Sequence, residues 1–390
     1  MFRKTPNAIV GVDLGNHALK AVRLQRQGSG FTLARVSLVL SHRDPQSQTP
    51  PTEQELATLI RSTLSLVRVS GADTHFVVNS PVGAIRYVEL PRMPLEDLRT
   101  ALKYNSAAHL RQNFENYTFD ASALDEDSVH AFAPASRKKA PAVGKTKALV
   151  AGLPNTETLL FYHAARRAGV RPHSLQLAPI ALINGLEAAN PEIFHGESVA
   201  LLDMGLLSTS LTVLDRGKPQ LTRTVPMGGK HLTEYLAQGS PADFARAERS
   251  KTQGEIDLAQ ALADAGANLI REICSSINFF ENNTDQSVSR ILVAGASARS
   301  ESLVAALANQ TGKICQPWCP SARLALHLPV EQRELFTAQQ STFATALGAA
   351  LSHLSSPPAP PEKPSAPSAA SAVSPPVAPR PPSRPPARSA

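Results

Sequence analysis

Two halves of the chain open in the same way, with a buried strand that ends in Asp-x-Gly and leads into a second strand. Residues 9–16 read IVGVDLGN, and residues 200–209 read ALLDMGLLST. A glycine in a strand-to-strand turn lets backbone N–H groups approach phosphate oxygens, and an aspartate at the strand end can hold the waters of a magnesium ion. One Asp-x-Gly occurs in ordinary turns, but two at equivalent places predict a pair of hairpins that clamp a triphosphate from both sides. The candidate residues are Asp13, Gly15, Asn16 and Lys20 in the first half and Asp203, Gly205, Ser208 and Thr209 in the second, with magnesium held through water by Asp13 and Asp203.

The segments around these turns predict an α/β fold. Period-two or continuous apolar runs indicate strands, and apolar residues at i, i+3 and i+4 indicate helices. Strands are predicted at 8–13, 19–24, 31–40 and 74–78 and again, after the pattern restarts near Val199, at 199–203, 210–214, 221–225 and 290–294. Helices are predicted at 52–65, from Pro94, at 155–168, within 231–282 and at 343–353. The repeat of strand groups indicates two lobes.

Composition excludes several classes of protein. The formal net charge is +7, but much of the excess falls in residues 137–147 and in the C-terminal tail, and aromatic residues make up only 5%. This does not favour nucleic-acid binding, which interleaves aromatic with basic side chains. Three cysteines give no disulfide framework and fit a reducing compartment. Because no apolar run approaches the ~20 residues that span a bilayer, we expect a cytoplasmic protein.

Two segments are expected to lie outside the folded lobes. Residues 354–390 consist almost entirely of Pro, Ala and Ser with a few Arg, a composition that cannot offset chain entropy and predicts a disordered tail. The tail is interpreted as a solvated spacer, with a ligand for a Pro-binding domain as the alternative. Residues 131–143 are interpreted as an exposed loop, with contact to an anionic membrane surface as the alternative.

Four stretches carry a resemblance to a known family. They are VGVDLGNHALKAV at 10–22, IRYVELPRMPLE at 85–96, the segment at 201–233 with the two turn motifs, and residues 291–302. In this order they resemble the actin-like ATPases, a superfamily that includes actin, DnaK-type chaperones, sugar kinases and FtsA. Within it, the chain is most similar to the PilM family of type IV pilus assembly, over about residues 7–353.

The resemblance implies a division of the chain into four parts. Residues 7–90 and 171–196 would form the first actin-like lobe, and residues 91–170 a small α/β subdomain inserted as in FtsA and PilM. Residues 197–353 would form the second lobe, with a helical subdomain at about 231–285. The tail at 354–390 is not covered by the resemblance.

The resemblance also extends the candidate binding site for ATP and Mg²⁺. It implies a Gly-Gly turn before a helix, a Glu-x-x-Lys pair that contacts ribose and base, and an adenosine turn, which are matched by Gly228, Gly229, Glu248, Lys251, Gly295 and Ala296. The adenosine turn keeps one glycine where relatives have three, and Leu206 and Leu207 replace small residues. Gln176 stands near the position of an acidic residue in relatives and cannot accept a proton from water. These departures predict nucleotide binding with weak or absent hydrolysis.

By the same resemblance, the chain is expected to act as an ATP-binding scaffold of pilus biogenesis and twitching motility. A groove between the first lobe and the inserted subdomain would receive the N-terminal cytoplasmic peptide of a PilN-like inner-membrane protein, which would hold the chain peripherally at the inner membrane. The helix that bears Leu95, Leu98 and Leu102 is a candidate groove wall, with core packing as the alternative. Other pilus proteins or ATPases remain further candidate partners. The alternative functions are a type II secretion-type or FtsA-like assembly protein, a nucleotide-free pseudo-ATPase of the same fold and, with less support, a sugar kinase.

Overall fold

The structure is a computed structural model that describes residues 6–28, 30–41, 49–124, 144–238, 241–253 and 255–355. The expected tail beyond residue 355 and the expected loop at 131–143 lie outside the described residues. Within the described residues, no helix is both long and apolar enough to cross a membrane.

The first lobe is built on a six-stranded sheet with the order β14-β3-β2-β1-β4-β8. β1 pairs antiparallel with β2 and β2 with β3, whereas β4 lies parallel to β1 and β8 parallel to β4. β1 is buried along its whole length, as its apolar run predicts. The strands are β1 (Ala8–Leu14), β2 (Ala18–Gln27), β3 (Gly30–Leu40), β4 (Asp73–Val78), β8 (Ser174–Leu177) and β14 (Ala325–Leu326).

The second lobe repeats this arrangement in a five-stranded sheet with the order β11-β10-β9-β12-β13. β9 and β10, then β10 and β11, pair antiparallel, and β12 and β13 continue in parallel from β9. Five strands therefore recur with the same order and the same directions, which confirms the doubled two-lobed fold. The strands are β9 (Ser198–Met204), β10 (Thr209–Asp215), β11 (Lys218–Val225), β12 (Arg290–Ala294) and β13 (Ile314–Pro317).

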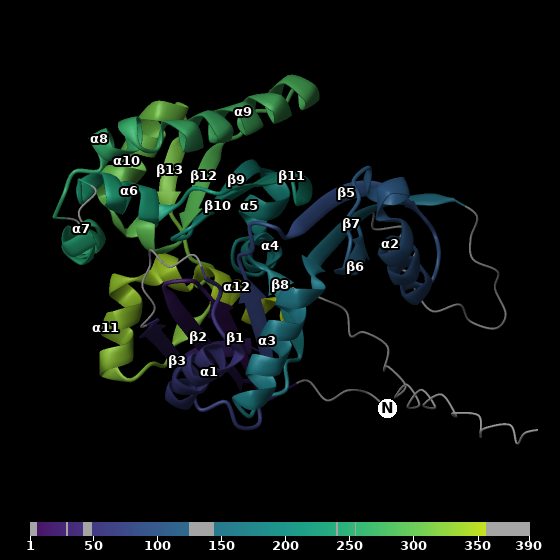
Figure 1. Ribbon diagram of the computed structural model, residues 1–390, viewed down its shortest axis with the longest axis horizontal. Helices are drawn as coiled ribbons and strands as arrows, with labels where there is room; N and C mark the ends of the chain where they lie inside the picture. Colours follow the sequence, from purple (N-terminus) through teal and green to yellow (C-terminus); the bar gives the residue numbers. More distant parts are fainter. Residues whose placement is uncertain are drawn as a thin grey trace, which may run out of the picture. The chain divides into compact units, whose positions relative to one another are not determined.

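A third, three-stranded sheet projects with α2 to one side of the lobes (Figure 1), and these elements are called the inserted subdomain below. The sheet begins at Ala84, whereas the inserted subdomain was expected to begin at residue 91. Its order is β5-β7-β6, with β7 antiparallel to both neighbours, and α2 packs on one face. Leu98 and Leu102 of α2 are fully buried in the core between helix and sheet, and Leu95 packs against that core. The elements are β5 (Ala84–Pro91), α2 (Leu95–Leu110), β6 (Tyr117–Ala123) and β7 (Lys145–Pro154).

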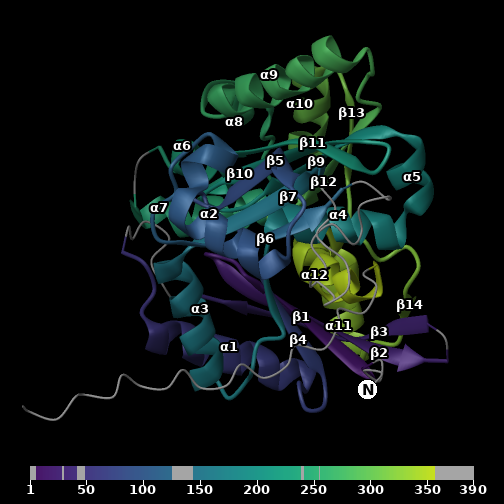
Figure 2. The ribbon, with the colours of Figure 1, turned by 90° about the vertical axis from the view of Figure 1, so that its right-hand side faces the viewer.

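Other helices cover the two large sheets. α1 begins with a capping box in which Thr52 and Glu55 satisfy each other's backbone N–H groups, and it packs with α3 on the first lobe. The helices α8, α9 and α10 lie at the opposite end, whereas α11 lies beside β3 of the first lobe (Figure 2). The bounds are α1 (Glu53–Val67), α3 (Asn155–Arg167), α5 (Pro191–Gly196), α6 (Gly229–Leu236), α7 (Pro241–Gln253), α8 (Ala259–Asp264), α9 (Ala267–Thr284), α10 (Glu301–Thr311) and α11 (Val330–Ala338), with short 3₁₀ helices η2 (Ala296–Arg299) and η3 (Gln340–Phe343).

Two helices, α4 (Ala178–Ala189) and α12 (Ala344–Ser355), pack on each other between the sheets. Their backbones touch at Gly348, where an added Cβ would lie 2.1 Å from the carbonyl oxygen of Ala181. Only glycine permits this approach. α12 also packs on β1 and α4 on β9, so this helix pair connects the sheets that carry the two Asp-x-Gly turns.

Candidate functional site

The first turn places a buried carboxylate at the end of β1. Asp13 is 6% exposed, and its Oδ2 accepts a hydrogen bond from Lys20 Nζ at 2.9 Å. The two residues are direct neighbours across the β1–β2 hairpin, so the antiparallel register sets this ion pair. Lys20, a candidate residue of the predicted triphosphate site, is thus held beside Asp13, the predicted magnesium ligand.

The second turn places an equivalent carboxylate at the end of β9. Asp203 is 5% exposed, and its Oδ2 accepts a hydrogen bond from Asn79 Nδ2 at 3.3 Å. The pKa of Asp203 is raised to about 7. Burial is the largest cause and the charge of Asp13 adds to it, whereas Lys20 and the bond from Asn79 act in the opposite direction. The structure therefore brings the two predicted acids, one from each lobe, close enough for their charges to interact.

Three glycine-containing segments meet behind the second turn. An added Cβ on Gly228 would lie 2.4 Å from the carbonyl oxygen of Gly205. Gly295 has a φ of +95°, and its Cβ would lie 2.4 Å from the carbonyl oxygen of Met204, so the one glycine kept in the adenosine turn stands where a side chain has no room. The N–H of Gly229 donates to the Gly205 carbonyl at 2.9 Å. The first backbone N–H of α6 is therefore used in a hydrogen bond to the second Asp-x-Gly turn.

The predicted ribose-contacting pair forms a closed network on α7. Lys251 is 3% exposed, and its ammonium donates to the Gly229 carbonyl, Thr233 Oγ1 and Glu248 Oε2 at 2.9, 2.6 and 2.6 Å. Thr233 Oγ1 also donates to Glu248 Oε2. Three acceptors use the three donors of a lysine. In this structure the pair joins α6 to α7.

The remaining predicted residues differ in their surroundings. Asn16 and Ala296 are exposed, whereas Ser208 and Thr209 are buried. The Thr209 hydroxyl donates to the Met227 carbonyl at 2.7 Å, and the Ser208 carbonyl accepts from the N–H of Gly205 at 3.0 Å. Both residues thus take part in the turn's own hydrogen bonds.

Two residues near the acids were not singled out from the sequence. Asn79 follows the end of β4, and a polar residue directly after a buried strand was the available signal. His17 lies in the first turn, where burial lowers its pKa and the charges of Glu248 and Lys251 act on it from the second lobe. Charged groups of both lobes therefore act on His17.

The acids fit a hydrated divalent cation. Two buried carboxylates compete for one Lys20 ammonium, and one of them has its pKa raised toward neutrality. A magnesium ion there would supply the positive charge that the pair lacks and would orient phosphate oxygens. Gln176, which stands near the position of an acidic residue in relatives, donates its Nε2–H to Ser352 Oγ on α12 at 2.8 Å and lines the groove described next.

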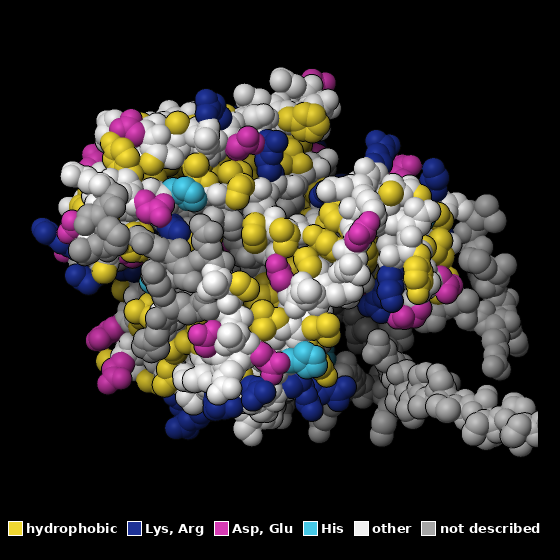
Figure 3. Space-filling view, viewed as in Figure 1, with side chains coloured by type: hydrophobic (Ala, Val, Ile, Leu, Met, Phe, Trp, Pro, Cys, Tyr) yellow, Lys and Arg dark blue, Asp and Glu magenta, His cyan; other side chains and the backbone are white. Residues whose placement is uncertain are grey.

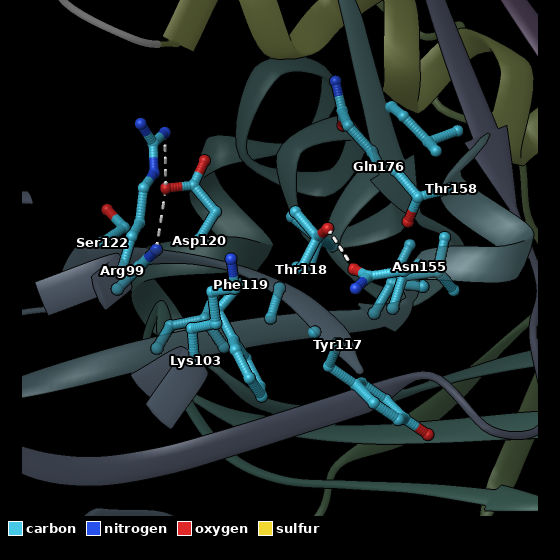
Figure 4. A pocket seen from close by; sticks show the side chains of 18 of the residues that line it. Arg99, Lys103, Tyr117, Thr118, Phe119, Asp120, Ser122, Asn155, Thr158 and Gln176 are labelled. Atoms are coloured by element: carbon cyan, nitrogen blue, oxygen red, sulfur yellow. Dashed lines mark hydrogen bonds and ion pairs between the residues drawn. The ribbon is translucent and has the colours of Figure 1, made fainter. Parts of the chain in front are cut away.

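A second candidate site is a groove of about 680 Å³ between the inserted subdomain and the first lobe. Its apolar wall includes Leu149, Leu153, Leu175, Leu177 and Ile180, and its polar rim includes Arg99, Lys103, Asp120 and Asn155 (Figure 4). Side chains of both charges lie interspersed on the exposed surface of the inserted subdomain (Figure 3). α2, the helix predicted as a candidate groove wall, lines the groove with Arg99, Thr100 and Lys103. Its leucines Leu95, Leu98 and Leu102 instead pack in the core against the sheet, as the core-packing alternative predicts.

Comparison with known proteins agrees with this architecture. The sequence model of the family described as type IV pilus assembly protein PilM matches residues 164–354. The solved PilM-PilN type IV pilus biogenesis complex superposes with a TM-score of 0.71 and 23% identity, over 89% of this chain and 99% of that chain. A weaker likeness is to the ethanolamine utilization protein EutJ from Carboxydothermus hydrogenoformans, with a TM-score of 0.47, 16% identity, and coverage of 89% of this chain and 90% of that chain. The protein thus has the fold of that complex's chain, and its residues 164–354 are similar in sequence to the family of type IV pilus assembly protein PilM.

Proposed function

We propose that the protein is a scaffold of type IV pilus assembly that binds the N-terminal cytoplasmic segment of a PilN-like inner-membrane protein in the groove beside β6. The observation that carries this proposal is the groove itself, which has a volume of about 680 Å³ and joins an apolar wall to a polar rim. The likeness to a chain solved as a PilM-PilN complex supports the identity of the partner. Binding to such a partner would hold the protein at the inner membrane.

A direct test is the affinity for a synthetic peptide that carries the first ~15 residues of the cognate PilN-type protein. Thr158→Arg places a long cationic side chain in the groove, because Thr158 lines it from α3. The matched control is Thr156→Arg, on the same helix at an exposed position outside the groove lining.

Fluorescence anisotropy should show micromolar binding that is lost in Thr158→Arg and kept in Thr156→Arg. A scrambled peptide should not bind. Equal affinity of the two variants, or no binding by the folded wild-type protein, would place the partner elsewhere.

The second part of the proposal is that ATP with Mg²⁺ binds between the two Asp-x-Gly turns and is hydrolysed slowly or not at all. The meeting of Asp13 and Asp203 supports the magnesium site. Nucleotide would close the lobes and so set the shape of the groove, which is a linkage between two binding events. This linkage rests on the proposed division of the chain into lobes, inserted subdomain and helical subdomain. In that division, nucleotide would bind between the two lobes, and the peptide would bind between the first lobe and the inserted subdomain.

A nucleotide-free docking protein of the same fold is the second candidate. The observation that favours it is the use of Lys251 and of the first α6 amide in internal hydrogen bonds. Calorimetry with ATP and magnesium, on wild type and on the double variant Asp13→Ala, Asp203→Ala, separates the two. Micromolar binding that the double variant loses would support the clamp, and its absence from the folded wild type would leave the nucleotide-free form.

A further inference from the structure

The groove is lined by the free edge of a strand. β6 stands at the end of the sheet order β5-β7-β6, so within the described chain its one strand neighbour is β7. Six consecutive residues of β6, from Tyr117 to Ser122, line the groove. A strand that contributed only one face would contribute alternate residues, because successive side chains point to opposite faces. The lining therefore includes the edge of the strand.

The hydrogen bonds identify the backbone groups that point outward from this edge. The N–H of Leu124 donates to Lys147, and the N–H of Asn155 donates to Asn116. Both pairs continue the antiparallel register of β6 with β7, in which Asp120 lies opposite Ala151. Since hydrogen-bonded pairs alternate along an antiparallel ladder, the even-numbered residues of β6 bond to β7. The N–H and C=O groups that point away from β7 belong to Tyr117, Phe119, Ala121 and Ala123.

One of these outward groups is capped by a neighbouring side chain. The N–H of Ala121 donates to Asp120 Oδ1 at 2.9 Å, and Arg99 donates to the same oxygen at 3.1 Å (Figure 4). The Asp120 side chain is 64% exposed, and Arg99 reaches it from α2, where it also pairs with Glu96 at 2.6 Å. A charged carboxylate that accepts a hydrogen bond from an edge N–H disfavours pairing of that edge with unwanted strands.

We propose that the PilN-like segment binds as an additional strand on β6, and that Asp120 is a guard whose carboxylate leaves the Ala121 N–H when a carbonyl of the segment takes its place. This deepens the proposed docking function and rests on it. Strand addition gives affinity through main-chain hydrogen bonds and specificity through alternate side chains. The exposed ion pair of Asp120 with Arg99 is inexpensive to open.

The two sides of the groove predict the chemistry of the two rows of side chains. Segment residues beside Phe119 and Ala121 would point to the face on which α2 packs, where Arg99 and Lys103 lie. Residues beside Thr118 and Asp120 would point to the opposite face, toward apolar side chains of β7, β8 and α4. The partner segment should therefore be extended, with an apolar row alternating with a polar or acidic row.

The guard role predicts a gain of affinity from removing an acid. With the same peptide as above, Asp120→Ala should tighten binding by about 3- to 10-fold, the value of one internal hydrogen bond that no longer has to be broken. Asp120→Asn keeps an acceptor oxygen at the same place and should bind nearly as the wild type does. Asp97→Ala, an exposed acid of α2 outside the groove lining, is the matched control and should change nothing.

Strand addition is tested independently by N-methylating the peptide one amide at a time. Binding to the wild-type protein should fall at every second amide in the paired stretch, because only alternate N–H groups face β6. On the protein side, Ala121→Pro removes an outward N–H without removing a bond to β7 and should weaken binding, whereas Ala121→Val should not.

The outcomes distinguish the hypothesis that the peptide docks in the groove from the hypothesis that it adds as a strand on β6. If the unmodified peptide does not bind, both the proposed docking function and the strand addition on β6 fail. If it binds but tolerates methylation without alternation, or if Asp120→Asn tightens binding as much as Asp120→Ala, docking stands and strand addition with a guard is overturned.

Discussion

Asp203 offers a test of the site formed by the two acids that needs no ligand. It is buried at the end of β9, with Asp13, Lys20 and Asn79 around it, and its pKa is raised from 3.8 to about 7. We expect Asp203→Asn, which has nearly the same shape and no charge, to stabilise the protein at pH 8.

The magnitude follows from the pKa. Its rise from 3.8 to about 7 corresponds to about 4 kcal/mol in favour of the neutral acid. Because the pKa is higher in the folded than in the unfolded protein, folding takes up a proton between these two values. The contribution of Asp203 to the free energy of unfolding therefore decreases as pH rises from about 4 to about 7, and stays low above that. The variant should gain nothing near pH 4 and up to ~4 kcal/mol at pH 8.

The assay is thermal unfolding from pH 5 to pH 8.5 for wild type, Asp203→Asn and the exposed control Asp97→Asn. At about 2 °C per kcal/mol for a chain of this size, the Asp203→Asn variant should melt roughly 8 °C higher at pH 8. Most of that difference should be gone at pH 5. A variant that is no more stable at pH 8, or whose advantage does not depend on pH, would refute the placement of two acids in one desolvated site. With Mg²⁺ and ATP, the wild type should regain stability that the variant does not.

Three further substitutions test the packing around the site. Gly348→Ala should lower the melting temperature by several degrees, since its Cβ would lie 2.1 Å from the Ala181 carbonyl oxygen and overpacking typically costs about 1–3 kcal/mol. The control is Gly312→Ala, where a Cβ meets nothing within 4 Å but φ is +66°. This control measures the cost of backbone strain alone. Lys251→Met should cost about 1–3 kcal/mol in urea unfolding, because it removes the buried ammonium that donates to the Gly229 carbonyl, Thr233 and Glu248. Tyr87→Phe removes the 2.7 Å hydrogen bond from β5 to a threonine of β11 and should cost about 1 kcal/mol, seen as a lower urea midpoint with an unchanged slope.

Local patterns were sufficient to predict β1 to β4, β9 to β12 and the doubled arrangement, but not β5, β6, β8, β13 or β14. The Asp-x-Gly turns could be predicted because a buried strand, a terminal acid and a glycine are neighbours in sequence. The same applies to α1, whose capping residues Thr52 and Glu55 stand three positions apart. The proposed roles of the predicted cleft residues stay predictions, although the structure brings Asp13 and Asp203 together.

The groove could not be predicted in the same way. The leucine spacing in α2 correctly predicts that one face of the helix is buried. It does not predict that the polar face of α2 borders the groove, because helical periodicity does not show what lies beside that face. Arg99 and Lys103, on that polar side, look like ordinary surface charges in the sequence.

The sequence by itself determined the strands around the two Asp-x-Gly turns and helices such as α1, because periodicity and turn residues act over a few positions. Only the tertiary structure decided that β6 is an edge strand, that the Ala121 N–H faces outward, and that the pKa of Asp203 is raised. Strand order, ladder register and burial each depend on segments far apart in the chain, so no local pattern around Asp120 or Asp203 encodes them.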